Sequence, residues 1–165
     1  MSLLLLAILI VMLIGVWYLS FTATRLDRLH HRVETSWANL DAALKTRSAI
    51  ALEIARSNLT DPASSMLLLA AAHVAIVADQ VDRSEAEEEL SRLLLSLVEE
   101  DVLVDDNEIF RELSLARERL RIAIALHLEA VTRTQAQRRR PIVKIFRLAG
   151  RAPLPVRYPF EDIQV

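Results

Sequence analysis

The first 24 residues of this 165-residue chain carry no charged side chain, and this run constrains the fold of everything after it. Residues 3–19 are apolar apart from Gly15 and the polar ring atoms of Trp17 and Tyr18. A helix needs about 20 such residues to cross the hydrocarbon core of a bilayer. The two aromatic residues stand near the end of the run, where interfacial aromatic belts lie. The sequence therefore predicts a membrane anchor over residues 1–24. Its lipid-facing side chains are expected to include Leu3, Leu9, Leu13, Trp17 and Tyr18.

A cleaved signal peptide is the alternative interpretation of this run. An uncleaved anchor is favoured because no basic residue precedes the run, it exceeds a usual signal-peptide core, and no small-x-small site follows cleanly. Arg25, Arg28 and Arg32 follow the run directly. Because cytoplasmic flanks are enriched in Lys and Arg, the N-terminus is expected outside and everything after Thr24 in the cytoplasm. The predicted location is the plasma membrane, crossed once.

The composition disfavours most familiar kinds of active site. The chain has no cysteine, which excludes a disulfide framework, a thiolate zinc site and a cysteine nucleophile. It has two glycines, too few for a phosphate-binding loop or a nucleophile elbow. No glutamate stands three residues before a histidine, as a di-metal bundle would need. We therefore expect no catalytic residue, no cofactor and no metal.

Apolar residues recur at gaps of three or four over residues 26–55, with no Gly or Pro among them, which predicts a helix that continues the anchor. Asp61 and Pro62 provide the N-cap oxygen and the N1 proline that start a second helix. Ser84 and the glutamate three residues later have capping-box spacing. This spacing favours a new helix at Ser84 over one helix covering residues 62–100.

A fourth helix is predicted from about Asn107 to Gln137, followed by a short apolar helix over residues 142–149 that Gly150 would end. Helices joined by short connections predict an all-α fold, in which the anchor continues into an antiparallel up-down four-helix bundle. The predicted domains are the anchor, a cytoplasmic bundle over residues 25–140, and a basic amphipathic segment with a proline-containing tail over residues 141–165.

Charge is segregated along the second half of the chain. Residues 79–108 hold twelve acidic and two basic side chains, which we interpret as a solvated face because calcium-loop spacing is absent. Residues 133–157 hold eight basic and no acidic side chains. Nucleic-acid binding is one interpretation of this basic segment, but no nucleic-acid-binding motif surrounds it, so we expect no nucleic-acid partner. The other interpretation is contact with an anionic lipid surface.

The up-down topology favours the lipid interpretation, because a fourth helix would end at the membrane-proximal side, beside Arg25. A three-helix version would carry the same residues away from the bilayer. The break near Arg83 and the lipid interpretation therefore depend on each other. The basic residues expected at the membrane surface are Arg25, Arg28, Arg138, Arg139, Arg140, Lys144 and Arg147.

Few polar residues interrupt the apolar helix faces. Arg47 and Arg119 are candidates for buried ion pairs, with Asp41 or Glu118 among the possible partners. Trp37 is the largest side chain on the first apolar face and is expected to anchor the core. The histidines at positions 30, 31, 73 and 127 are expected to be partly buried or interfacial rather than metal ligands.

The first predicted cytoplasmic helix resembles the opening helix of the LemA family. The resemblance is carried by RLDRLHHRVE at residues 25–34 and by WANLDAALKTR at residues 37–47. Residues 90–94, 107–113 and 118–120 resemble the family's second half more loosely, as does the basic tail. The residues matching the family's core motif are Trp37, Leu40, Leu44 and Arg47. Residues 127–131 read HLEAV, where the family often has an aromatic residue followed by Asn-Asp-Ala-Val.

This resemblance implies an N-out anchor, a cytoplasmic antiparallel helical bundle and no established enzymatic activity. The leading functional hypothesis is a membrane-anchored interaction or scaffold protein that docks another membrane or cytoplasmic protein, with self-association left open. An accessory or stator-like subunit of a larger membrane complex is the alternative. A stator needs a long uninterrupted coiled coil, which Asp61-Pro62 would break. A membrane-bound hydrolase or metalloenzyme ranks third because its motifs are missing.

Overall fold

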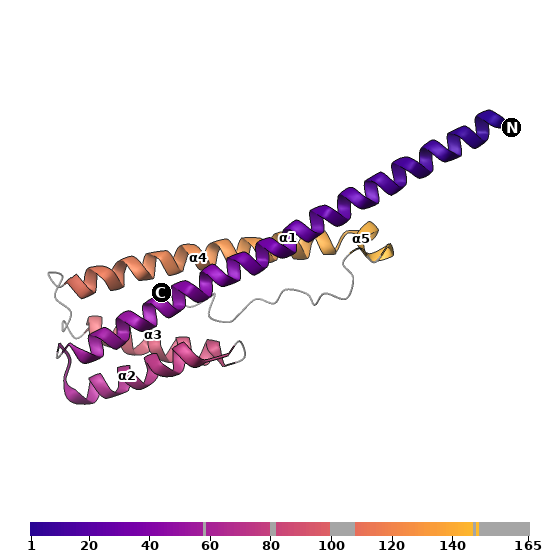
Figure 1. The fold of residues 1–165 in the computed structure, drawn as a ribbon. Helices are drawn as coiled ribbons and strands as arrows, with labels where there is room; N and C mark the ends of the chain where they lie inside the picture. Colours follow the sequence, from indigo (N-terminus) through magenta and orange to yellow (C-terminus); the bar gives the residue numbers. More distant parts are fainter. Residues whose placement is uncertain (58, 80–81, 100–107, 147, 149–165) are drawn as a thin grey trace. The chain divides into compact units, whose positions relative to one another are not determined.

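The computed structural model describes residues 1–57, 59–79, 82–99, 108–146 and 148, and within these the regular elements are all α-helices. Figure 1 shows their order along the chain. The helices are α1 (Ser2–Arg56), α2 (Pro62–Val77), α3 (Arg83–Glu99), α4 (Glu108–Arg138) and α5 (Pro141–Ile145). The all-α class predicted from the sequence is therefore confirmed.

The chain forms two compact units, and α1 and α4 each contribute to both. Unit 1 contains the described residues of Met1–Thr35 and Glu129–Val156, and unit 2 contains those of Ser36–Leu128. Unit 1 thus combines the apolar start of α1 with the end of α4 and with α5.

The core of unit 2 is built from four helical segments. One apolar cluster draws residues from α1, α2, α3 and α4. Its most fully buried side chains are Ala51, Ile54, Leu68, Ala72, Ala75 and Leu90. A second cluster joins Leu40 and Leu44 of α1 to Leu120 and Ile124 of α4, and Trp37 packs against it half-buried. The three-to-four periodicity over residues 26–55 therefore identified the buried face of α1 correctly.

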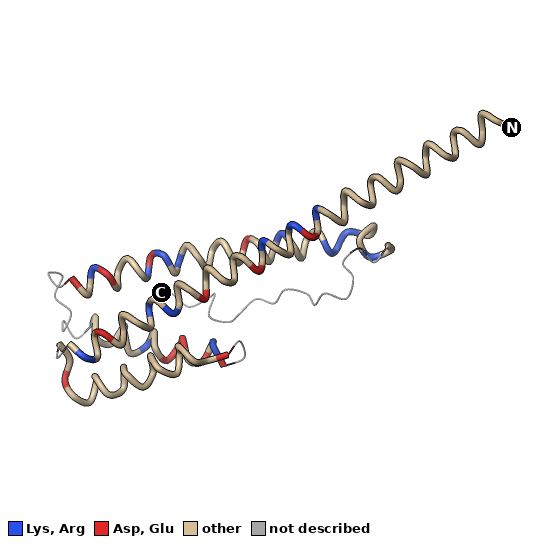
Figure 2. Tube along the Cα trace, in the orientation of Figure 1, with Lys and Arg blue, Asp and Glu red and all other residues tan. Residues whose placement is uncertain are grey.

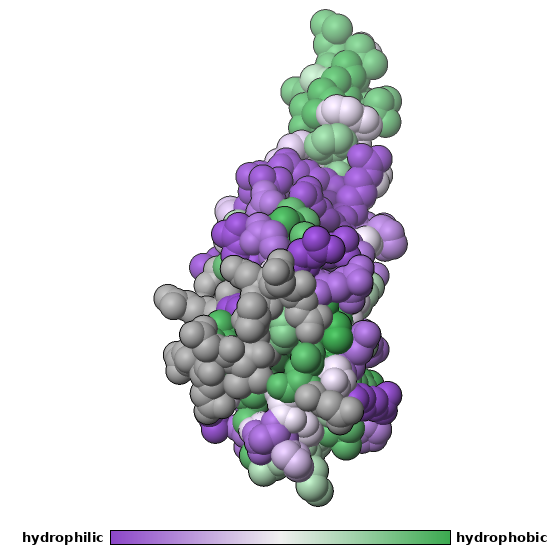
Figure 3. Space-filling model, turned by 90° about the vertical axis from the view of Figure 1, so that its left-hand side faces the viewer, coloured by the Kyte–Doolittle hydropathy of each residue, from purple (hydrophilic) through white to green (hydrophobic). Residues whose placement is uncertain are grey.

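The N-terminal part of α1 has no protein packed around it. α1 is the only helix within the described residues that is long and apolar enough to cross a membrane, and its most apolar window is entirely unburied. Figure 2 shows no acidic or basic residue along this part of the helix. In the face shown in Figure 3 the same part is hydrophobic and gives way abruptly to a hydrophilic surface. Length and composition thus make α1 a candidate membrane span.

The start of α2 follows the predicted signal. Asp61 is the N-cap, and its Oδ1 accepts hydrogen bonds from the amides of Ala63 at 2.9 Å and Ser64 at 3.2 Å. Pro62 occupies the first helical position, where its missing N–H leaves no hydrogen bond unmade. Hydrogen bonds from the side chain and then the amide of Ser64 lower the pKa of Asp61.

Two helices, rather than one, follow Pro62, but the predicted cap of the second is wrong. α2 ends at Val77 and α3 begins at Arg83, so Ser84 lies inside the helix. The Oδ1 of Asp79 accepts a hydrogen bond from the Asp82 amide at 3.2 Å. The guanidinium of Arg83 donates to the carbonyl of Ala75 at 2.9 Å. The Asp79 carboxylate, rather than a Ser84–Glu87 capping box, therefore accepts an amide hydrogen bond just before α3.

The last helices differ from the prediction mainly at their ends. α4 ends at Arg138, close to the predicted Gln137. α5 ends at Ile145 rather than near residue 149, and the Leu148 amide donates to the Val143 carbonyl at 3.0 Å as the chain turns away. Asn107, the predicted start of the fourth helix, lies outside the described residues, as do the proposed cap Gly150 and the proline-containing tail.

Candidate functional site

Unit 1 contains a cavity of about 190 Å³ at the place where the apolar run of α1 ends. We call it the Arg25–Arg140 pocket. Its lining residues come from α1, from the end of α4 and from α5 with the residue before it. They are Tyr18, Phe21, Thr22, Arg25, Gln137, Arg140, Pro141, Ile142 and Val143. The pocket thus joins the two regions that the sequence predicts at a membrane surface.

Packing between α1 and α4 within unit 1 sets the walls of this pocket. Leu26 of α1 and Val143 of α5 are each 2% exposed. The hydroxyl of Thr134 is 2.8 Å from the Ala130 carbonyl and 3.4 Å from the Leu29 carbonyl of α1. These contacts hold the end of α4 against the first cytoplasmic turns predicted for α1.

A proline places the basic residues that follow α4. The residue before a proline is disfavoured in the helical region, and Arg140 has an extended conformation with φ −62° and ψ 136°. Pro141 then starts α5 at a position where an N–H is not needed. The chain therefore leaves α4 and re-enters a helix within three residues, which brings Arg140 and Ile142 to the same cavity.

Several polar side chains of the pocket form no hydrogen bond or ion pair with other described residues. Gln137 is 5% exposed, yet its side-chain amide has no hydrogen-bond partner within the described part of the chain. Arg25 and Arg140 are exposed, and neither forms an ion pair with another described residue. Thr22, by contrast, donates its hydroxyl to the Tyr18 carbonyl at 2.9 Å. Two cations and one amide that line the cavity therefore remain available to a ligand.

The other described basic residues of the predicted set do not line this pocket. Arg28 lines a second cavity of about 450 Å³, which shares Phe21 and Arg25 with the first. Arg139 and Lys144 are exposed and Arg138 is half-buried, while Arg147 lies outside the described residues. Among the described residues, the structure therefore brings Arg25 together with Arg140 in the first cavity and with Arg28 in the second.

The predicted anchor residues are exposed along the free part of α1. The exposed fractions are 80% for Leu3, 63% for Leu9, 71% for Leu13, 69% for Trp17 and 45% for Tyr18. The Trp17 ring stacks on Phe21, with centroids 6.1 Å apart and planes 21° from parallel. An aromatic pair thus marks the end of the apolar run.

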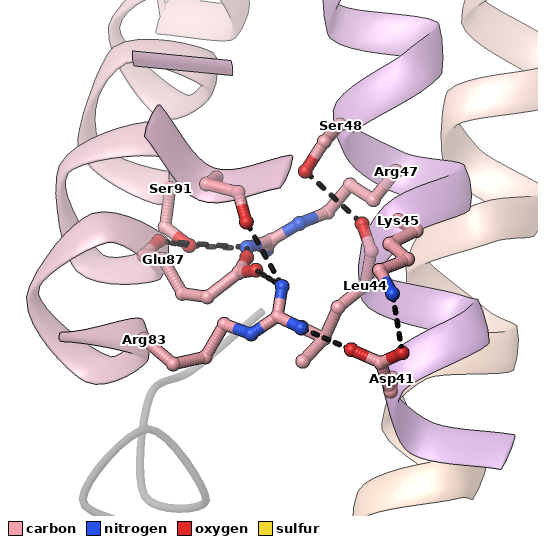
Figure 4. A network of polar contacts seen from close by, with 9 residues as sticks. Asp41, Leu44, Lys45, Arg47, Ser48, Arg83, Glu87 and Ser91 are labelled. Carbon is pink, nitrogen blue, oxygen red and sulfur yellow. Dashed lines mark hydrogen bonds and ion pairs between the residues drawn. The ribbon is translucent and has the colours of Figure 1, made fainter. Parts of the chain in front are cut away.

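Unit 2 contains a buried ion-pair network between α1 and α3, drawn in Figure 4. Arg47 is 3% exposed and its Nη2 lies 2.6 Å from Oε2 of Glu87, which is 1% exposed. Nη1 of Arg47 donates to the Ser91 hydroxyl at 3.0 Å. Arg83 pairs with Asp41 and lies 3.8 Å from the other Glu87 oxygen. Two arginines thus face one buried carboxylate.

The buried Arg47 was predicted, but the partner suggested for it is wrong. Asp41 lies one and a half turns before Arg47 on the same helix and pairs instead with Arg83 and Lys45. The prediction for Arg119 is also wrong, because this residue is exposed and Glu118 pairs with Arg121 at 2.7 Å. The partner of the buried Arg47 is therefore Glu87, which comes from α3.

Glu87 was predicted only as part of a capping box with Ser84, and its buried ion pair with Arg47 was not predicted, although one signal was present. Arg83 and Glu87 are four residues apart and continue the buried stripe of Ala86, Leu90 and Leu94. Charged residues in register with an apolar stripe are candidates for buried pairing. Burial is the largest influence on Glu87 and raises the pKa of its carboxyl, while the positive charges of Arg47 and Arg83 oppose that rise.

His127 and Trp37 form a third polar contact, inside unit 2. Their ring centroids are 5.6 Å apart, and Nδ1 of His127 lies 2.9 Å from the Ser36 hydroxyl. His127 is 2% exposed, and burial lowers the pKa of its imidazole. This histidine is buried beside the predicted core tryptophan.

Within the described residues, no group of three or more His, Asp or Glu side chains could hold a metal ion. No protein-family model, curated protein or solved structure matches this chain, so the resemblance to the LemA family stays a prediction.

Proposed function

We propose that this protein is a single-span plasma-membrane protein whose cytoplasmic helices dock other proteins at the membrane face. The observation that carries the proposal is the two-part character of α1. One uninterrupted helix, Ser2–Arg56, is apolar and uncovered at its start, and it is packed into an apolar core towards its end. A fully apolar helical surface of this length is stable in lipid, whereas water would penalise its exposure.

The N-out orientation and an antiparallel up-down four-helix bundle are parts of the same proposal. The orientation is supported by the basic residues that begin at Arg25, since positive charge accumulates on cytoplasmic flanks. The bundle is supported by the four helical segments that share one core cluster and by the short connection between α2 and α3. The resemblance of residues 25–47 to the LemA family supports a non-enzymatic, LemA-type scaffold role.

The docking role is supported by the exposed apolar side of α2. Met66 is 73% exposed, Leu67 59%, Val74 54% and Val77 68%. α2 has no Asp, Glu, Lys or Arg, so an apolar helix or groove of a partner protein would fit it better than a charged surface. Contiguous exposed apolar residues of this kind commonly mark interaction sites. An accessory subunit of a larger complex ranks second, because the break before Pro62 interrupts the long coiled coil that a stator needs.

Two measurements test the proposal. The full chain is expected to resist carbonate extraction from membranes, with an N-terminal tag labelled on intact cells and a C-terminal tag protected. A photo-crosslinking residue at Val74 is expected to capture a discrete protein partner, whereas the same residue at the exposed Arg111 of α4 should not. Extraction by carbonate or labelling of only the C-terminal tag would refute the anchor or its orientation. Equal crosslinking from both positions would refute docking through α2.

A further inference from the structure

We propose that the Arg25–Arg140 pocket is a binding site for the phosphate group of an anionic phospholipid. The inference rests on the proposed membrane anchor and adds a specific ligand to it. It names a defined cavity, built by α1, α4 and α5 within unit 1, rather than a general attraction of basic residues to a charged surface.

The polar groups of the pocket match an oxyanion. Arg25 and Arg140 reach the cavity from two separate elements, and neither is neutralised by a described acidic residue. Guanidinium groups bind phosphate oxygens through paired, charge-assisted hydrogen bonds. Because both arginines are solvent-exposed in the free protein, they are available to approach a phosphate without breaking an existing ion pair.

Gln137 adds an uncharged hydrogen-bonding group to the cavity. Its side chain is 5% exposed, lines the cavity, and has no hydrogen-bond partner among the described residues. Its amide atoms are not among the fully buried atoms that lack a partner, so they are reached from the cavity. The amide NH2 of Gln137 is a donor that a phosphate oxygen would satisfy.

The apolar walls favour a lipid over free phosphate. Tyr18 and Phe21 line one side of the cavity, and Ile142 and Val143 line another. A free inorganic phosphate gains nothing from such walls, whereas the glycerol and first acyl carbons of a lipid would cover them. The adjoining second cavity, lined by Trp17 and Phe21, extends this apolar surface along α1. Tyr18 and Phe21 end the apolar run, which is the depth at which lipid headgroups lie beside a membrane span.

The test uses delipidated full-length protein in detergent, analysed by native mass spectrometry during titration. The probes are phosphatidylglycerol, phosphatidylcholine and inorganic phosphate. The pocket variant is Arg25→Gln/Arg140→Gln. The matched control is Arg32→Gln/Arg139→Gln, which removes the same charge from two exposed residues that line neither cavity. A third variant, Gln137→Leu, removes the buried amide and leaves the net charge unchanged.

The unmodified protein and the control are expected to retain phosphatidylglycerol in preference to phosphatidylcholine. The pocket variant should lose about tenfold or more in affinity relative to the control, because it loses charge-assisted hydrogen bonds in addition to charge. Gln137→Leu should weaken binding in the same direction, with circular dichroism unchanged from the unmodified protein. Inorganic phosphate should not displace the lipid.

Two results would overturn the inference. Equal losses in the pocket variant and the control would show that charge alone attracts the lipid. Displacement by inorganic phosphate at comparable concentration would assign the pocket to a free anion. Both results leave carbonate resistance unaffected, so the failure of the pocket is distinguishable from the failure of the anchor.

Discussion

Replacing Arg47 by methionine is expected to destabilise unit 2 severely, because it leaves the Glu87 carboxylate buried without its main partner. Glu87 is 1% exposed, and its shortest ion pair, at 2.6 Å, is with Arg47. After the substitution the nearest described cation is Arg83, at 3.8 Å from the other carboxylate oxygen. Removing one member of a buried pair costs about 3–5 kcal/mol, since the remaining charge keeps its desolvation penalty.

Replacing both partners should restore most of the loss. In Arg47→Met/Glu87→Leu no uncompensated charge remains between α1 and α3, and well-packed apolar replacements of buried pairs are often neutral or stabilising. A total folding free energy of about 5–15 kcal/mol makes the single-variant loss easy to measure. With Glu87→Leu as the second single variant, the double-mutant cycle is expected to give a coupling energy of about 3 kcal/mol or more.

The assay is guanidinium chloride unfolding of the full chain in detergent micelles, followed by Trp37 fluorescence in a Trp17→Phe background. Arg92→Met is the matched control, because Arg92 is 67% exposed and its pair with Glu89 lies at the surface. The control should lose less than about 1 kcal/mol. If Arg47→Met lost no more stability than the Arg92→Met control, the ion-pair network would not be desolvated. If Arg47→Met/Glu87→Leu were as unstable as Arg47→Met, the ion-pair reasoning would be refuted.

Three other predictions concern separate parts of the chain. Asp61→Ala should lower the thermal midpoint of unfolding, and Asp61→Asn should largely preserve it. The pKa of Asp61 is lowered from 3.8 in the folded protein. The stabilisation by the charged cap should therefore be lost in acid, as the pH falls through that lowered value. The pKa of His127 is lowered from 6.5, so folding stability should decline as the pH falls below about 6.5, and His127→Gln should flatten this dependence in pH-resolved melting curves. Leu9→Arg should disfavour membrane insertion by about 3 kcal/mol, measured as a smaller carbonate-resistant fraction, and an unchanged fraction would contradict the span.

Local signals in the sequence predicted the helices well. The period of Leu40 and Leu44 placed these residues on the buried face of α1, and Asp61 began α2 as expected. The prediction failed at the start of α3, where Ser84 lies inside the helix instead of capping it. It also failed for the partner of Arg47, which comes from α3 rather than from α1.

The sequence alone determined the uncharged run, the start of α2 and the amphipathic period of α1, because these depend on interactions within one or two turns of chain. Only the tertiary structure decided which charges meet and which remain unpaired. Glu87 finds Arg47 because α3 packs on α1, and Arg25 shares a cavity with Arg140 because the end of α4 packs on α1 within unit 1. The place of Gln137 in the wall of this cavity likewise follows from packing between segments distant in sequence, which no local pattern encodes.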